Sequence, residues 1–332
     1  MTDYKNLKLI ASSSPHIRSK DDTRSIMIDV CIAMLPALVV SCFVFGLQAL
    51  VLTVISVVSC VFWEWAYRKL MKKSCSVGDC SAVVTGMLLA FVCPVSLPWW
   101  VIVIGSFFAI VVVKQLYGGI GCNFLNPALA GRAVLVASYA GAMTTWVQPG
   151  FKNAVAIFGS AADVATGATP LALMKDGAFD QLPEIADMFL GFVGGSLGET
   201  SAVALLVGFL WLLLRKVISW QIPVAYIATV AVVSLISAPA GIGAVDYMLY
   251  SIFGGGLMLG AIFMATDYAT SPVTAKGQIV YGIGCGALTV LFRYFGLFPE
   301  GVTYAILLMN ACVWVIDRYT APRRFGVKGG KA

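Results

Sequence analysis

The stretch "SIMIDVCIAMLPALVVSCFVFG" (residues 25–46), followed closely by "LVLTVISVVSCVFWEWAY" (residues 50–67), decides the fold class. Each run approaches the roughly 20 apolar residues that an α-helix needs to cross the hydrocarbon core of a bilayer. The whole chain of 332 residues is 60% hydrophobic and 11% charged, which lies far from the composition of soluble domains. The sequence therefore predicts an all-α polytopic membrane protein.

Ten apolar windows follow one another along the chain, bounded by charged residues or by Gly and Pro. They cover residues 25–46, 50–67, 80–97, 99–117, 129–147, 189–214, 220–238, 245–265, 278–297 and 302–317. We expect one transmembrane helix for each window.

The basic residues predict the orientation of these ten helices. If the N-terminus is cytoplasmic, all but three of the 22 Lys and Arg residues fall in or beside cytoplasmic segments, the exceptions being Lys152, Lys175 and Arg293. This bias is the positive-inside rule, and it accounts for the net charge of +6 without a nucleic-acid partner. Both termini are therefore expected on the cytoplasmic side of the membrane.

Five windows precede the longest loop and five follow it. The expected organisation is a cytoplasmic N-terminal segment (1–24), a first five-helix half (25–147), an extracytoplasmic loop (148–188), a second five-helix half (189–317) and a basic cytoplasmic tail (318–332). An odd number of helices in each half makes the halves run in opposite directions, as in inverted-repeat transporters.

Small and polar residues interrupt the apolar pattern at "GGIGCNFLNPALAGRA" (118–133), "GGSLGETSA" (194–202) and "FMATDYATSPVTAKG" (263–277). Tight helix packing through glycines is the simpler interpretation of these segments. A membrane-embedded carboxylate points instead to function, and Glu199 is expected near the midplane, about ten residues into its span. Asp267 and Arg132 are expected nearer the cytoplasmic edge, where an anchor is the simpler interpretation of both; Asp267 is the second candidate for ion coupling.

Two further side-chain patterns carry structural expectations. Glu64 and Arg68 lie four residues apart on one predicted helix and should form an ion pair along its surface. The spacing of the nine cysteines matches no metal-binding set, so no metal site is expected from this chain alone, and Cys122 is the candidate ligand for a site shared with a partner.

The long loop contains the polar stretch "SAADVATGATPLALMKD" (160–176). Gly167 permits a tight turn and Pro170 biases Thr169 towards an extended conformation, so we expect the Thr169 hydroxyl to point outward. The loop contains no His, so the hydroxyl lacks a base that could activate it as a nucleophile. Two interpretations remain: Thr169 caps a short helix at "PLALMK", or it is the passive acceptor of a modification.

Several segments together resemble the family of membrane subunits that includes RnfD, of ion-translocating ferredoxin:NAD oxidoreductase, and NqrB, of the sodium-pumping NADH:quinone reductase. "DVATGAT" (163–169) is similar to the flavinylation motif Asp-x-x-(Ser/Thr)-Gly-Ala-Thr. The resemblance extends over nearly the whole chain through "SPHIRSKDDTRSIMIDV", "DCSAVVTGMLLAF", "PWW", "NPALAGRA", "MTTW", "GSLGETSA" and "MATDYATSPVTAKGQ". The short N-terminal segment and the wording "GRAVLVASYAGAMTTW" favour the RnfD branch over the NqrB branch.

The resemblance implies cofactors and partners. Thr169 is expected to carry FMN through a phosphoester made by a separate flavin transferase, with Asp163, Thr166, Gly167, Ala168 and Pro170 as the surrounding motif. A second flavin, riboflavin, is expected in or beside the membrane part. Its candidate ligands are Asn123, Asn126 and Arg132, because they offer amide and guanidinium donors next to apolar surface. Other Rnf subunits (A, B, C, E and G) are the expected partners.

The expected function is flavin-based electron transfer within a complex that couples ferredoxin oxidation and NAD reduction to sodium or proton movement. The chain supplies no catalytic residue of its own and acts as the redox subunit of a translocase. Three alternatives stay open at this point: an NqrB-type subunit, a secondary transporter with inverted repeats, and a purely structural anchor for partner subunits.

Overall fold

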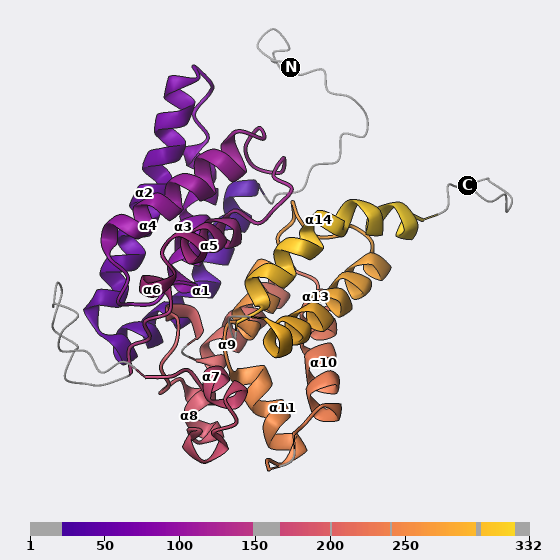
Figure 1. Cartoon of the computed structure of the whole chain (residues 1–332). Coiled ribbons are helices and arrows are strands. Elements are labelled where there is room, and N and C mark those ends of the chain that lie inside the picture. Colours follow the sequence, from indigo (N-terminus) through magenta and orange to yellow (C-terminus); the bar gives the residue numbers. More distant parts are fainter. Residues whose placement is uncertain (1–21, 149–166, 200, 240, 297–299, 323–332) are drawn as a thin grey trace, which may run out of the picture.

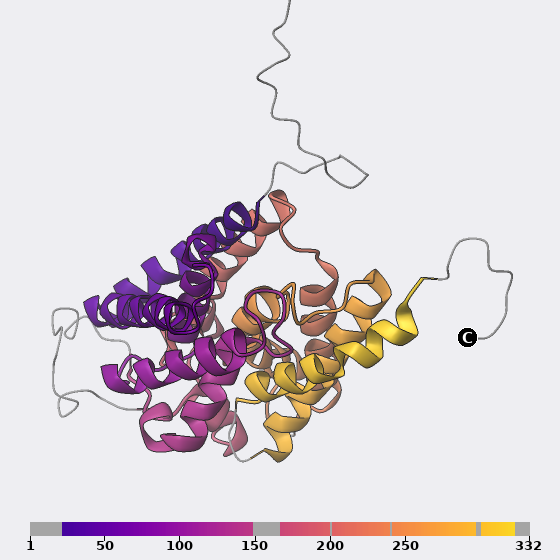
Figure 2. The same ribbon diagram turned by 90° about the horizontal axis from the view of Figure 1, so that it is seen from above.

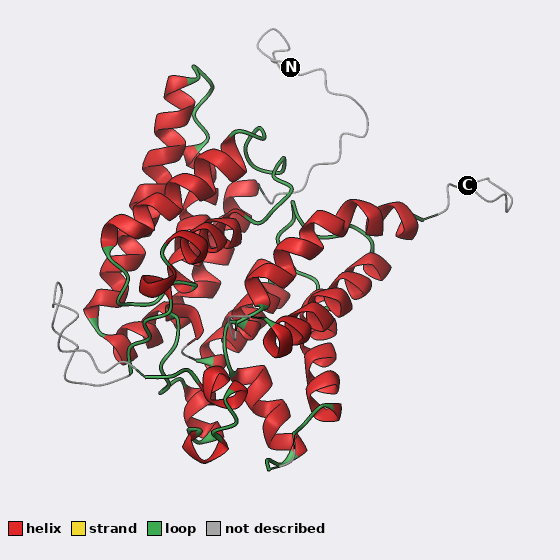
Figure 3. Ribbon diagram, viewed as in Figure 1, coloured by secondary structure: helices red, strands yellow, loops and turns green. Residues whose placement is uncertain are grey.

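The computed structural model describes residues 22–148, 167–199, 201–239, 241–296 and 300–322, and within these ranges the regular structure is helical, without a β-strand (Figure 3). The first half contains α1 (Thr23–Phe45), α2 (Leu47–Leu70), η2 (Val77–Asp79), α3 (Ser81–Phe91), α4 (Trp99–Phe107), the π-helix η3 (Phe108–Gln115), α5 (Pro127–Ser138) and α6 (Ala140–Met143). The remainder contains α7 (Pro170–Lys175), η6 (Phe179–Gln181), α8 (Ile185–Leu190), η7 (Leu197–Glu199), α9 (Ala202–Leu214), α10 (Gln221–Ile236), α11 (Ala244–Phe253), α12 (Leu257–Leu259), the π-helix η8 (Gly260–Met264), α13 (Ala275–Phe295) and α14 (Val302–Thr320). The all-α prediction is confirmed.

The ten apolar windows all contain helix, but four of them are not continuous helices. Among the described residues, three helices (α1, α2 and α13) are long and apolar enough to cross a membrane, and the bent pair α11–η8 raises the number to four. The expectation of an unbroken helix is wrong for residues 80–97, 129–147, 189–214 and 245–265. The breaks follow from the residues present: α3 stops shortly before Pro94, and the last pair bends by 61° at the Gly254–Gly256 run.

The helices form two groups that lie side by side (Figures 1 and 2). Helices α1 to α6 make up one group and α10 to α14 the other, with α7 and α8 at one end of the molecule. Helix α9 follows the long loop in sequence, yet it packs against α1 of the first group. One continuous apolar core therefore runs through both groups.

Glycines allow the closest helix pairs to form. A Cβ at Gly86 of α3 would lie 2.7 Å from the Cα of Val57 on α2, and one at Gly282 of α13 would lie 2.8 Å from the Cβ of Ala225 on α10. Gly208 of α9 lies against the backbone carbonyl of Ala33 on α1 in the same way. Small residues permit such approach where lipid supplies no hydrophobic drive between helices, so close packing explains these glycines.

Both groups repeat one local arrangement. The π-helix η3 leads through a glycine-rich loop to α5, and the π-helix η8 leads through a polar loop to α13. Each following helix is capped by a side chain, Asn126 for α5 and Thr274 for α13. The segments "NPALAGRA" and "TDYATSPVTAKG" are therefore the helix entrances that follow the two π-helices.

Large apolar side chains cover much of the outer surface. Phe43, Ile236 and Trp314 are at least 70% exposed. A soluble protein rarely exposes so many large apolar side chains, whereas lipid tails are as apolar as these side chains. The outer surface thus agrees with a membrane protein.

Candidate functional site

Thr169 forms the N-cap of α7. Its backbone is extended (φ −71°, ψ 154°), its Oγ1 accepts a hydrogen bond from the Ala172 amide at 3.3 Å, and Pro170 occupies the first helical position. Its side chain is buried, with an exposed fraction of 6%, whereas Ala168 is exposed. The expectation of an outward hydroxyl is wrong, because the extended residue before Pro170 turns its side chain back onto the helix that follows.

The turn before Thr169 is held by the end of the first half. The Gly167 amide donates a hydrogen bond to the Trp146 carbonyl at 3.2 Å, and a Cβ at Gly167 would overlap the side chain of Gln148. Asp163 and Thr166 lie outside the described residues. Within the part of the motif that the structure describes, a residue larger than glycine at position 167 would require the exposed Gln148 side chain to move.

Asn123 and Asn126 line one cavity of about 100 Å³ between the two groups of helices, which we name the Asn123 cavity. Lys114 and Asp267 line it as well. Both polar atoms of the Asn126 side chain form hydrogen bonds, since its Oδ1 caps α5 and its Nδ2 donates to the Met264 carbonyl at 3.1 Å. Asn126 therefore joins the two groups of helices at the cavity wall.

Asp267 follows η8, outside the membrane-spanning helices, and its Oδ2 accepts a hydrogen bond from the Thr270 hydroxyl at 3.1 Å. Burial raises the pKa of the Asp267 carboxyl, and the hydrogen bond from Thr270 acts in the opposite direction. A residue that merely anchors a helix at the membrane edge is expected to be solvated. The Asp267 carboxyl is partly buried, so it fits a role in a polar site better than a role as an anchor.

Arg132 lies apart from the Asn123 cavity. It is 5% exposed, donates to the Thr303 hydroxyl at 3.0 Å and forms an ion pair with Glu300. The span pattern places Arg132 and Glu300 at opposite membrane faces, and their ion pair shows that these two placements do not hold together. The start of α14 meets the interior of α5, and the buried guanidinium requires that pairing.

Glu199 lies at a break and not within a continuous helix. It ends the short turn η7, between α8 and α9. One carboxylate oxygen accepts the Ser196 amide at 3.4 Å, and the other, Oε1, is buried without a hydrogen-bond partner among the described residues. Gly195 and Gly256 enclose the carboxylate, since a Cβ at either would lie 3.0–3.1 Å from its oxygens.

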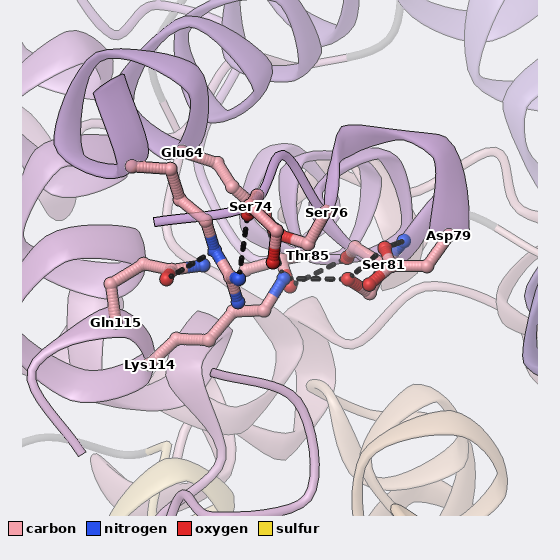
Figure 4. Close-up of polar contacts among 9 residues, drawn as sticks. Glu64, Ser74, Ser76, Asp79, Ser81, Thr85, Lys114 and Gln115 are labelled. Atoms are coloured by element: carbon pink, nitrogen blue, oxygen red, sulfur yellow. Dashed lines mark hydrogen bonds and ion pairs between the residues drawn. The ribbon is translucent and has the colours of Figure 1, made fainter. Parts of the chain in front are cut away.

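The best-connected buried polar cluster surrounds Lys114 (Figure 4). Its ammonium lies 2.7 Å from a Glu64 carboxylate oxygen and donates to the Ser81 hydroxyl at 2.6 Å, while Ser76 donates to the other Glu64 oxygen. Ser81 in turn donates to Asp79 at 2.5 Å. This cluster links the 74–81 loop to the wall of the Asn123 cavity.

The expected pair between Glu64 and Arg68 does not form. Arg68 donates instead to Gln115 at 3.1 Å and to the Ser74 carbonyl at 3.0 Å. Lys114 and Gln115, adjacent at the end of the π-helix, thus meet two residues one turn apart on α2. The sequence did not predict a role for Lys114, because its partner Glu64 lies 50 residues away. A lysine inside an apolar run could still have marked it as a candidate functional residue.

No group of three or more His, Cys, Asp or Glu side chains comes together for a metal within the described part of the chain. Cys122 is exposed.

Comparison with known proteins identifies relatives over the whole length. The profile of the NQR2, RnfD, RnfE family matches residues 10–326. The D subunit of the Na(+)-translocating ferredoxin:NAD(+) oxidoreductase complex of Acetobacterium woodii is 50% identical over 323 residues, covering 97% of this chain and 96% of the relative. The D subunit of the proton-translocating ferredoxin:NAD(+) oxidoreductase complex of Clostridium ljungdahlii is 41% identical, covering 96% of each chain. The D subunit of the ion-translocating oxidoreductase complex of Stutzerimonas stutzeri is 40% identical, covering 93% of each. The chain belongs to the NQR2, RnfD, RnfE family of membrane subunits.

Proposed function

We propose that this chain is the flavin-bearing electron-transfer subunit of a membrane complex that couples ferredoxin oxidation and NAD reduction to sodium or proton movement. The main support for this proposal is the similarity, over nearly the full length, to two proteins named as the D subunits of ferredoxin:NAD(+) oxidoreductase complexes. One of those names specifies sodium and the other protons, so the coupling ion is left open between them. The proposal includes assembly with other Rnf subunits.

The cofactor proposed at Thr169 is FMN, which supplies one- and two-electron redox chemistry when bound. The geometry is compatible with attachment, because the N-cap uses Oγ1 only as an acceptor and does not use the hydroxyl hydrogen that a phosphoester replaces. The 6% exposure has a consequence for maturation. The flavin transferase reaches Thr169 either before α7 docks or after its first turn has swung out.

The test of attachment uses the chain expressed with the flavin transferase. A denaturing gel under ultraviolet light is expected to show a fluorescent band, and mass spectrometry of the 153–175 peptide is expected to show FMN on Thr169. Thr169→Ala should give a dark band, because it removes the acceptor hydroxyl. Thr166→Ala keeps that hydroxyl and tests whether the flavin transferase needs the motif residue at position 166. A colourless parent band with an active transferase present refutes flavin attachment.

We also propose Glu199 as an ion-coupling residue, with Asp267 as the second candidate. The support is the buried Oε1 of Glu199, which has no hydrogen-bond partner among the described residues and lies in a helix break enclosed by two glycines. Unwound backbone and a carboxylate at a helix break are groups that a coupling cation can use. Glu199→Gln should lower ion uptake relative to electron flux in reconstituted vesicles, and Glu184→Gln, at an exposed glutamate, should not. Unchanged flux and uptake in Glu199→Gln would eliminate the assignment.

Riboflavin is proposed beside the Asn123 cavity, with Asn123 as the candidate amide, whose Nδ2 donates to the Leu125 carbonyl at 3.0 Å in this conformation, and without Arg132, which lies elsewhere. The cavity of about 100 Å³ is smaller than the 300–1,000 Å³ typical of pockets for such ligands. Riboflavin therefore does not fit the cavity in this conformation, and binding requires the exposed Ile120 and Tyr268 side chains in its wall to move apart. Asn123→Ala should lower the flavin released on denaturation without changing the covalent flavin.

A further inference from the structure

A larger cavity lies directly beside α7, which we name the Arg293 cavity. Its volume is about 340 Å³, and it is bounded by α7, α10, α11 and α13. Leu171 and Met174 of α7 form part of its wall, together with Val230 and Val290 from the facing helices. A volume in this range is typical of sites for small organic ligands, whose walls are mainly apolar with a few polar groups.

Two cationic side chains line this wall, the exposed Lys175 and the less exposed Arg293. Two of the Arg293 nitrogens donate to the Ser251 carbonyl at 2.5 Å and to the Gly254 carbonyl at 3.0 Å, at the end of α11. Its Nε is buried without a hydrogen-bond partner, and no carboxylate within the described residues forms an ion pair with it. An enclosed guanidinium with an unused donor favours a ligand that carries negative charge or accepts hydrogen bonds.

A chain of hydroxyls lies in the same wall. The Tyr247 and Tyr294 hydroxyls are 2.8 Å apart, and the Tyr294 hydroxyl is 2.8 Å from that of Ser237. Each hydroxyl both donates and accepts. The cavity therefore combines apolar walls, two cationic side chains and polar groups of both kinds, which together suit a flat heteroaromatic ring with carbonyl and N–H edges.

The place of Thr169 connects this cavity to the proposed flavin. Thr169 caps the N-terminus of α7, and the α7 side chains at Leu171 and Met174 enter the cavity wall. At about 1.5 Å rise per residue, the six residues of α7 span about 9 Å. The five-carbon ribityl chain and phosphate of FMN have a reach of the same order.

We propose that the isoalloxazine ring of the flavin on Thr169 lies in the Arg293 cavity, with Arg293 as the positive charge beside it. This inference rests on the proposed flavin attachment. A cation near the ring stabilises the anionic reduced flavin relative to the neutral oxidised form, so Arg293 raises the reduction potential of the covalent flavin. Arg293 is thus assigned as a tuning and positioning residue.

The first test replaces the charge in the assembled, flavin-loaded complex. Arg293→Gln is expected to keep the fluorescent gel band, because attachment occurs at Thr169, and to shift the potential of the covalent flavin to more negative values. Arg215→Gln is the matched control: Arg215 pairs with Asp29 at 3.1 Å and is 49% exposed, and its replacement should leave the potential unchanged.

The second test blocks the cavity without removing the cation. Val290→Trp places a large ring where the flavin is expected, and should make the flavin fluorescence more sensitive to quenching by iodide in solution. Tyr247→Phe removes one hydroxyl with little change in volume, and should shift the flavin absorption bands. These two variants decide the question if Arg293→Gln fails to assemble because α11 loses its cap.

The outcomes separate the two proposals. A parent chain without covalent flavin refutes the proposed attachment. A fully flavinylated parent, together with Arg293→Gln, Val290→Trp and Tyr247→Phe variants that retain the parent potential, spectrum and iodide quenching, refutes the placement of the ring and leaves the attachment intact.

Discussion

Removing the ammonium of Lys114 should destabilise the protein more than any exposed ion-pair change. Lys114 is 3% and Glu64 is 0% exposed, and their charged atoms are 2.7 Å apart. Lys114→Met leaves the Glu64 carboxylate buried with only the Ser76 hydroxyl as a close partner. Breaking a buried pair in this way costs about 3–5 kcal/mol, because the remaining charge is uncompensated.

Replacing both partners should recover most of that loss. In Glu64→Met/Lys114→Met no charge remains in the site, and apolar replacement of a buried pair is often neutral. We expect the double variant to lie within about 1 kcal/mol of the parent, so the losses of the two single variants should be far from additive. Ser81 keeps its hydrogen bond to Asp79 in this variant.

The assay is denaturant titration in mixed detergent micelles, followed by helical circular dichroism, for the parent, both single variants and the double variant. Arg215→Met is the comparison: the Arg215 guanidinium is 49% exposed and the Asp29 carboxylate 11% exposed, so solvent screens this pair more than the Lys114–Glu64 pair, and its loss should cost less. The reasoning is refuted if Lys114→Met loses no more stability than Arg215→Met, or if the double variant is as unstable as Lys114→Met.

Three further changes test the packing and the caps by the same titration. Gly86→Ala should cost about 1–3 kcal/mol, because its Cβ would lie 2.7 Å from the backbone of Val57, while Gly141→Ala, with nothing within 4 Å, should be nearly neutral. Asn126→Ala should cost at least the 0.5–2 kcal/mol typical of a lost N-cap, and a value near zero would contradict its role between the helix groups. Thr169→Ala should cost about 0.5–2 kcal/mol in unflavinylated protein, whereas Thr169→Ser should retain the cap.

Much of the candidate site could be predicted from the sequence because its signals are local. The turn around Gly167 and the short helix after Thr169 follow from the backbone preferences of neighbouring residues, and the structure has both. The direction of the Thr169 side chain was predicted wrongly, because it depends on the cap bond to Ala172 and on what packs over α7. The backbone preferences of neighbouring residues therefore determine the turn, whereas the burial of the Thr169 side chain depends on the segments that pack against α7.

The partners of the buried charges could not be predicted in the same way. Lys114 and Glu64 are 50 residues apart, and Arg132 and Glu300 are 168 apart. A hydropathy pattern gives the position of a charged residue along its own span, but it does not tell which helix lies beside that residue. The i,i+4 rule consequently favoured Arg68 for Glu64, and the actual partner came from the π-helix.

The sequence by itself determined the membrane class, the positions of the ten helical segments and the family, because hydrophobic length and extended similarity survive any arrangement of the helices. Only the tertiary structure decided where the helices break, which charges pair and which cavity adjoins α7. These features depend on contacts between segments far apart in the chain, and such contacts contribute to stability only once the helices have packed together.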